Sequence, residues 1–196
     1  MRLLHIDSSI LGEASASRPL SAAIVEAVTR AVPGVEIIRR DLNADPIPHL
    51  DGGLFAAALK GSAVLDEFLG ADIVVIGAPM YNFTIPSQLK AWLDRIVIVG
   101  KTVRYTEAGA KGLMGGKKVI IASSRGGLYG PGMPYQANDF QEPYLRAILG
   151  FIGIEDIEIV RAEGLSLGPE QRAAAMHAAL ASVSAALVGF APAKAA

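Results

Sequence analysis

The stretch DIVVIGAPMYNFTIPSQLKAWLD, residues 72 to 94, decides the fold. Residues 72–77 form an almost continuous apolar run, which is typical of a parallel strand buried on both faces. A helix is expected to open near Pro86, because apolar residues then recur at helical spacing, at Leu89, Trp92, Leu93, Ile96 and Val97. A buried strand that leads directly into an amphipathic helix is the repeating unit of α/β proteins.

The loop between this strand and this helix has an unusual composition for a turn. Met80, Tyr81 and Phe83 surround a single amide, that of Asn82. A connection that only turned a corner would be short and rich in Gly, Asn and Ser. We therefore expect this loop to lie against something flat, although aromatic residues packed as core beneath a turn are the alternative.

The same alternation extends through the whole chain. Apolar runs predict four more strands, over residues 2–7, 35–40, 117–124 and 154–164. Helical spacing predicts the other helices from Pro19 to about residue 32, over roughly 55–69, around 140–150 and over 169–188. Five strands alternating with helices predict an α/β three-layer sandwich: a five-stranded parallel sheet in the flavodoxin-like order 2-1-3-4-5, with helices on both faces. We expect one domain over residues 1–190 and a frayed tail over 191–196.

Composition excludes several classes of function. The 196 residues carry a net charge of −1 from 18 basic and 19 acidic side chains, without the basic stripe that nucleic-acid binding needs. No cysteine is present, so disulfides, thiolate catalysis and sulfur-ligated metals are excluded, and His5, His49 and His177 lack zinc-type spacing. No metal site and no membrane span are expected. A cytoplasmic protein with a small-molecule substrate is the expectation.

In this fold, ligands bind beyond the carboxyl ends of the strands, so loops 8–18, 78–85 and 124–132 matter most. The first loop offers Ser9, Ser15 and Ser17 just before a predicted helix start. Free N–H groups and the positive end of a helix dipole favour a phosphate there. The alternative is that Ser17 only caps the helix.

Two other nucleotide sites do not fit the sequence. The first loop has one glycine, Gly12, and so lacks the G-x-G-x-x-G of a dinucleotide fold. The segment GLMGGKK, residues 112–118, lacks the Ser or Thr of a triphosphate loop and precedes a strand where that motif would follow one. A mononucleotide phosphate is therefore expected.

The other two loops suit a flavin ring. Backbone groups and the Asn82 amide could read the polar edge of the ring, while Met80, Tyr81 and Phe83 cover a face. In the third loop, SSRGGLYGPG, Gly126 and Gly127 allow close approach of backbone N–H groups to the pyrimidine end, where reduced flavin is negative. Arg125 either adds charge there or is a solvated arginine.

Several motifs together resemble a known family. They are SSIL followed by S-x-S (residues 8–17), RDL with PIP (40–48), APMYNF-x-IP-x-QLK-x-W-x-D (78–94), VRYTE with GL and GKK (103–118), SRGG (124–127) and LGFIGI (149–154). This pattern resembles the FMN-dependent NADH azoreductases, also called NADH:quinone oxidoreductases, nearly from end to end.

The resemblance implies a flavodoxin-like homodimer with one FMN per subunit at the dimer interface. It assigns cofactor binding to three groups of residues: Ser9, Ser15, Ala16 and Ser17 at the phosphate and ribityl end; Met80, Tyr81, Asn82 and Phe83 at the ring edge; and Ser124, Arg125, Gly126 and Gly127 near the pyrimidine end. Relatives often carry a polar residue at position 16, so here only the backbone N–H of Ala16 can serve.

The implied reaction is a ping-pong, two-electron reduction of quinones and a reductive cleavage of aromatic azo compounds to amines. NADH is the implied electron donor, and the use of NADPH is left open. No obligate catalytic residue is assigned; Tyr81, Tyr105 and Tyr129 are candidate proton donors, as is solvent. A one-electron flavodoxin, a phospho-acceptor domain and a non-enzymatic FMN-binding module are the alternatives. The first is usually strongly acidic, the second needs an acidic cluster of which only Asp7 is present, and the third would not accept hydride from NADH.

Overall fold

A computed structural model describes residues 1–58 and 60–187. Its central feature is a parallel five-stranded sheet in the order β2-β1-β3-β6-β7. The strands are β1 (Arg2–Asp7), β2 (Glu36–Asp41), β3 (Ile73–Pro79), β6 (Lys118–Ser124) and β7 (Asp156–Ala162). In order of appearance among the strands of this sheet this is 2-1-3-4-5, so the predicted topology is confirmed.

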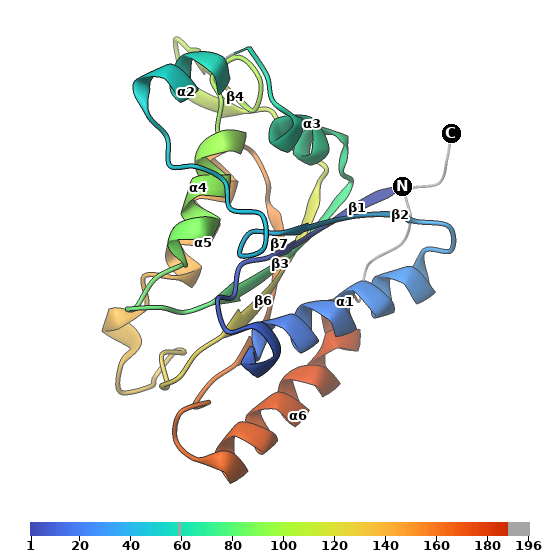
Figure 1. Cartoon of the computed structure of the whole chain (residues 1–196), viewed down its shortest axis with the longest axis vertical. Helices are drawn as coiled ribbons and strands as arrows, with labels where there is room; N and C mark the ends of the chain where they lie inside the picture. Colours follow the sequence, from blue (N-terminus) through green and yellow to red (C-terminus); the bar gives the residue numbers. More distant parts are fainter. Residues whose placement is uncertain (59, 188–196) are drawn as a thin grey trace.

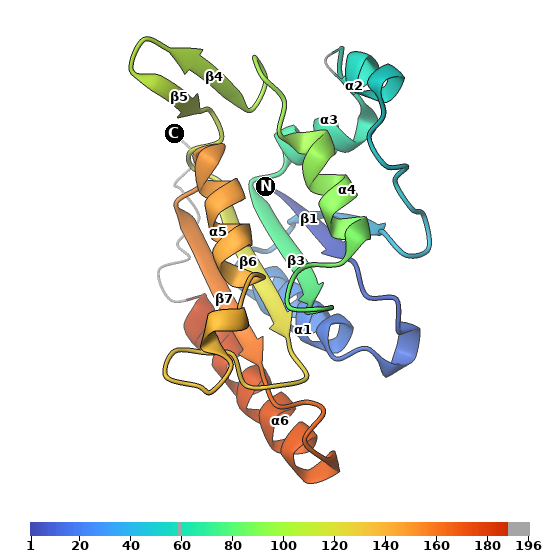
Figure 2. The ribbon, with the colours of Figure 1, turned by 90° about the vertical axis from the view of Figure 1, so that its left-hand side faces the viewer.

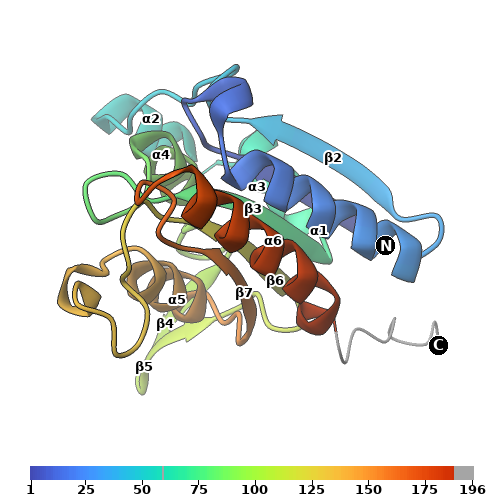
Figure 3. The same ribbon diagram turned by 90° about the horizontal axis from the view of Figure 1, so that it is seen from below.

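Helices cover both faces of the sheet (Figure 1). On one face lie α1 (Ser17–Ala31) and α6 (Pro169–Ala186), which run side by side (Figures 1 and 3). On the other lie α3 (Ala63–Gly70), α4 (Ser87–Ile96) and α5 (Glu142–Phe151). The predicted three-layer sandwich is therefore confirmed.

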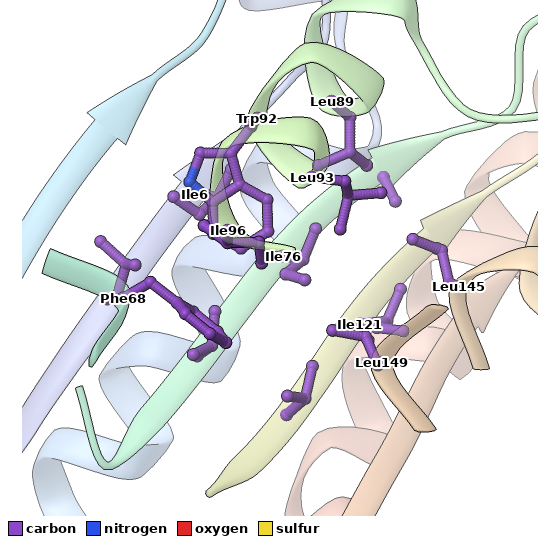
Figure 4. Close-up of a cluster of buried hydrophobic side chains, with 14 of the residues drawn as sticks. Ile6, Phe68, Ile76, Leu89, Trp92, Leu93, Ile96, Ile121, Leu145 and Leu149 are labelled. Atoms are coloured by element: carbon purple, nitrogen blue, oxygen red, sulfur yellow. The ribbon is translucent and has the colours of Figure 1, made fainter. Parts of the chain in front are cut away.

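The strand from the deciding stretch is the centre of the core. All seven residues of β3 are buried, because helices pack on both of its faces. Trp92 on α4 is fully buried and meets Phe68 on α3 edge to face, with ring centroids 5.8 Å apart (Figure 4). The apolar side of α4 thus lies against the sheet, as its spacing predicts.

The predicted helix over 55–69 is wrong, because the structure has two helices there. They are α2 (Gly52–Ala58) and α3. Gly61 has a φ of +117°, which no helix accommodates, and Ser62 then caps α3 by accepting the N–H of Leu65 at 3.2 Å. In the sequence, the pair Gly61-Ser62 marks this break.

The sequence analysis missed an antiparallel hairpin formed by β4 (Val103–Thr106) and β5 (Gly109–Gly112). It projects from the end of the molecule opposite the carboxyl ends of the sheet strands (Figure 2). Its strands have four residues each and are mostly exposed, so they lack the apolar alternation that reveals a strand.

The chain ends and connections complete the fold. Two short 3₁₀ turns, η1 (Gly12–Ala14) and η2 (Gln136–Asn138), lie in the connections after β1 and after β6. Among the described residues, no helix is long and apolar enough to cross a membrane. The tail predicted to fray, residues 191–196, lies outside the described residues.

Candidate functional site

The three loops singled out in the sequence follow β1, β3 and β6, which are neighbours in the sheet. The carboxyl ends of these three strands therefore lie at the same edge of the sheet; Figure 3 shows the molecule from below. Hydrogen bonds tie the loops together: Met80 N–H donates to the carbonyl of Ser124 at 2.8 Å, and the Tyr81 hydroxyl accepts the N–H of Ile10 at 3.2 Å. The Tyr81 hydroxyl also lies 3.3 Å from the hydroxyl of Ser9.

A cavity of about 260 Å³ opens where these loops meet. Seven of the twelve predicted cofactor residues line it: Ser9, Ala16, Met80, Tyr81, Ser124, Arg125 and Gly126. A neighbouring cavity of about 670 Å³ shares Met80 and Tyr81 and adds Asn82. Ser15, Ser17, Phe83 and Gly127 do not line either cavity but adjoin lining residues in the chain.

The serines of the first loop form a buried polar group. Ser9 and Ser17 are fully buried, Ser15 is 4% exposed, and the hydroxyls of Ser15 and Ser17 are 3.2 Å apart. Ser15 Oγ accepts the N–H of Arg18 at 3.2 Å, so Ser15 and not Ser17 caps the first turn. Ser17 is the first residue of α1, and Pro19 is its third and not, as expected, about its first.

Arg18, which directly follows these serines, uses its guanidinium to bind Asp41 and the backbone of Ser9. It forms a bidentate pair with Asp41 at 2.7 and 2.9 Å and donates to the carbonyl of Ser9 at 3.0 Å. The hydrogen bond from Arg18 lowers the pKa of the Asp41 carboxyl below its usual range. Arg18 thus fixes the backbone of the serine loop to the end of β2.

The second loop turns sharply between Tyr81 and Thr84, which exchange two backbone hydrogen bonds of 2.9 and 3.1 Å. Asn82 and Phe83, at the tip, have φ angles of +47° and +71°. Such left-handed backbone is uncommon for Asn and strained for Phe. Phe83 is 45% exposed, so the alternative of an aromatic packed as core beneath the turn is wrong for this residue.

Aromatic rings continue from this turn to the third loop. The ring of Phe83 lies 6.2 Å from that of Tyr129, and Tyr129 lies 6.0 Å from Tyr135. Phe140 N–H donates to the carbonyl of Phe83 at 3.0 Å, which holds the segment before α5 against the turn. The mouth of the site is therefore apolar and aromatic on this side.

Arg125 in the third loop is fully buried, so the alternative of a solvated arginine is wrong. Its side chain is 0% exposed, and its Nη1 donates to Glu163 at 3.0 Å. Its Nη2 lies 2.9 Å from a carboxylate oxygen of Asp139 and 2.5 Å from one of Glu142, without the alignment of a hydrogen bond. Burial alone would raise the pKa of Glu142, but the hydrogen bond from Arg161 and the charges of Arg125 and Arg161 outweigh it, so this pKa is lowered.

The two glycines after Arg125 are constrained by internal packing. A Cβ on Gly126 would come within 2.7 Å of Ser166 Oγ, and one on Gly127 within 3.0 Å of the Tyr129 ring. Their carbonyls accept the N–H groups of Ser166 and Gly164. Within the part of the chain that the structure describes, no protein acceptor is found for the N–H groups of Gly126 and Gly127.

The structure also adds site residues that the sequence analysis missed. Leu165 and Ser166, from the segment that joins β7 to α6, and Arg172, in the first turn of α6, line the 260 Å³ cavity. The signal was available, because this segment follows the carboxyl end of the fifth predicted strand. Tyr105 is not brought to the site: it lies on β4, in the hairpin at the opposite end of the molecule (Figure 2).

The comparisons with known proteins agree with this geometry. Residues 1–187 match a family model described as the flavodoxin-like fold. Among similar proteins, an FMN-dependent NADH:quinone oxidoreductase 1 from Xanthomonas axonopodis pv. citri (strain 306) is 56% identical over 94% of this chain and 96% of its own. A relative from Methylocella silvestris, also an FMN-dependent NADH:quinone oxidoreductase, is 54% identical over 91% of this chain and 95% of its own.

A solved structure resembles this one closely. It is an FMN-dependent NADH-azoreductase from Bacillus anthracis str. Ames Ancestor in complex with FMN, with a TM-score of 0.85, 26% identity and coverage of 97% of this chain and 99% of its own. The sheet order and the three converging loops agree with the sequence similarity, which extends over nearly the whole chain. The chain therefore belongs to the flavodoxin-like family of FMN-dependent NADH:quinone oxidoreductases.

Proposed function

We propose that this chain is an FMN-dependent NADH:quinone oxidoreductase that also cleaves aromatic azo compounds to amines. The observation that carries the proposal is the identity of 56% to a relative of that name over 94% of the chain. Azoreductases among the similar structures support the second activity. NADH is the electron donor, and use of NADPH is left open.

The residues of the site fit FMN. Buried serine hydroxyls and the start of α1 suit its phosphate, since the first N–H groups of a helix have no intrahelical acceptor. The Met80–Phe83 turn suits the ring edge, and the free N–H groups of Gly126 and Gly127 suit the pyrimidine end. We propose as cofactor-binding residues Ser9, Ser15, Ala16, Ser17, Met80, Tyr81, Asn82, Phe83, Ser124, Arg125, Gly126 and Gly127.

Arg125 serves this site as an anchor. Its guanidinium holds Glu163, and Glu163 accepts the N–H of Tyr129 at 3.0 Å, so loop 124–132 is fixed at two points. Its backbone N–H donates to the carbonyl of Ala162 on β7 at 2.9 Å. Gly126 and Gly127 are thereby held in place at the cavity by the ion pairs of Arg125.

Bound FMN supplies two-electron transfer from NADH to a quinone or azo compound. The protein binds and orients both partners, and one pocket must admit them in turn, which gives ping-pong kinetics. No side chain is assigned as an obligate acid or base. Tyr81 and Tyr129 border the site and can hold a proton there, whereas Tyr105 of the same chain cannot.

We further propose a homodimer with FMN at the interface. Large apolar side chains are exposed around the mouth of the site, which a second subunit would cover: Ile10, Leu11, Phe83, Tyr135 and Phe140. The cytoplasmic location expected from the sequence stays a prediction.

The visible spectrum of the purified protein tests the function. Flavin bands that bleach anaerobically on addition of NADH, and return on addition of a quinone, are expected. Reappearance of the bands with methyl red, together with release of its amine products, is expected for azo cleavage. A protein that is colourless and cannot be reconstituted with FMN would contradict the proposal, and a bound flavin that NADH leaves oxidised would favour a non-enzymatic FMN protein.

A further inference from the structure

Arg172 is a cation at the proposed phosphate end that no sequence motif indicated. It is the fourth residue of α6 and lines the 260 Å³ cavity together with Ser9, Ala14 and Ala16. Its Nη2 donates to the carbonyl of Ala14 at 3.1 Å, so the guanidinium lies directly beside the first loop. Arg172 is half-buried, so it is accessible to a ligand in the cavity.

The charges around the cavity make Arg172 distinctive. Among the residues that line it, the charged ones are Arg125 and Arg172, and no carboxylate lines it. The charge of Arg125 is offset by its contacts with Asp139, Glu142 and Glu163. Within the described residues Arg172 forms no ion pair, whether with neighbouring Glu170 or with Glu13 of η1. Its hydrogen bond goes to a neutral carbonyl, so no carboxylate neutralises its charge.

Helix geometry adds to this charge. The start of α1 contributes to the cavity through Ala16, its N-cap residue, whereas α6 contributes the side chain of Arg172 from its first turn. The N-terminal end of a helix carries a partial positive charge that falls off within about one turn. The N-terminal end of α1 and the guanidinium of Arg172 together favour an anion in this cavity.

We propose that Arg172 is a further binding residue for the phosphate group of FMN. The inference rests on the proposed function, since it assumes that the cavity holds FMN. The buried serines can supply hydrogen bonds to the phosphate but no charge. Arg172 supplies the charge, from an element at the far end of the chain, and its bond to Ala14 holds the serine loop beside it. A guanidinium–phosphate hydrogen bond is charge-assisted and stronger than a neutral one.

The test compares FMN with riboflavin, which has the same ring and no phosphate. Full-length apoprotein is titrated with each flavin by fluorescence quenching, for the wild type and for R172Q, R172K and R30Q. Arg30 is a matched control, since it lies 72% exposed near the other end of α1. We expect R172Q to bind FMN about tenfold more weakly, R172K to lose less than about threefold, and R30Q to match the wild type.

Riboflavin affinity should be the same in all four proteins, and the loss of FMN affinity on adding NaCl should be steeper for the wild type than for R172Q. An equal loss for both flavins in R172Q would overturn the proposal, because Arg172 would then only hold the loop. Unchanged FMN affinity would overturn it as well, while leaving the proposed function intact. A wild type that binds neither flavin would overturn both.

Discussion

At the scale of single residues, the left-handed backbone of Phe83 predicts that glycine is more stable than alanine at this position, the reverse of their usual order. Its φ of +71° is strained for any residue with a Cβ, and its ring is 45% exposed. We expect Phe83→Gly to be more stable than Phe83→Ala by about 1 kcal/mol, because both lose the ring and only glycine relieves the strain. Urea unfolding of the apoproteins measures the difference.

A matched pair at an exposed helical position controls for the greater flexibility of glycine in the unfolded chain. Ala174 on α6 is suitable, and there Gly should be less stable than Ala by about 0.5–1 kcal/mol. If Phe83→Ala is at least as stable as Phe83→Gly, the turn does not hold the left-handed conformation in solution.

Arg125 gives the second prediction at this scale, because its charge is buried among three carboxylates. Arg125→Gln leaves Asp139, Glu142 and Glu163 without their shared cation. We expect the free energy of unfolding to fall by about 3–5 kcal/mol. Urea unfolding checks this, with Arg146→Gln as control, since Arg146 is exposed and makes one bond to the carbonyl of Ile157.

A double variant separates charge from packing at Arg125. Arg125→Gln combined with Asp139→Asn removes a carboxylate whose ion pair is with Arg125, and it should recover part of the loss. Glu142 is less suitable, because it also pairs with Arg161. A double variant that loses the full sum of both single losses would show that the carboxylates do not depend on Arg125 for their charge balance.

At the scale of elements, the strands and helices that could be predicted from the sequence are those with a long apolar pattern. Four of the five sheet strands and the inner face of α4 contain buried residues, and the fifth strand, β2, packs Ile37 and Ile38 against the core as half-buried side chains, so strand order and helix face could be predicted. The break at Gly61 and Ser62 was missed because a helical apolar pattern runs across it, whereas the structure follows local backbone geometry. The β4–β5 hairpin was missed because it buries almost nothing.

The link between α1 and β2 gives a prediction about pH. The hydrogen bond from Arg18 lowers the pKa of Asp41 in the folded protein, below the value of about 3.9 of an unfolded chain. A lowered carboxyl pKa contributes stability above the unfolded pKa, and this is lost as the pH falls through the folded pKa. We therefore expect Asp41→Asn to be less stable than the wild type at pH 7, with a difference that shrinks below about pH 4.

Urea unfolding of both proteins between pH 7 and pH 3 measures that difference. Glu26→Gln is the control, because Glu26 forms a solvent-exposed pair with Arg30 that contributes little. A wild-type advantage that stays constant down to pH 3 would show that the carboxylate charge of Asp41 does not carry the effect.

At the scale of the whole molecule, topology explains which part of the site could be predicted. Loops that follow the neighbouring strands β1, β3 and β6 must meet, so the strand order alone places the predicted residues together. Arg172 and Ser166 were missed because no motif marks them, although they follow the carboxyl end of the last strand. The burial of Arg125 was missed because its carboxylates come from two segments distant from it in the sequence, residues 139–142 and Glu163.

The proposed dimer gives the last prediction, because a cofactor held at an interface is bound more weakly by a dissociated subunit. If FMN lies between two subunits, its affinity must fall as the protein is diluted through the dimer dissociation constant, and FMN must in turn strengthen the dimer. We expect sedimentation velocity to show dimers that dissociate at higher dilution with FMN than without it. Phe140→Asp should weaken both equilibria, since Phe140 is 58% exposed beside the Phe83 turn and burying a charge in an interface is costly. Asp substituted for Leu180 is the control, because Leu180 is exposed on α6, away from the site mouth. An FMN affinity that is the same for monomer and dimer would place the cofactor wholly within one subunit.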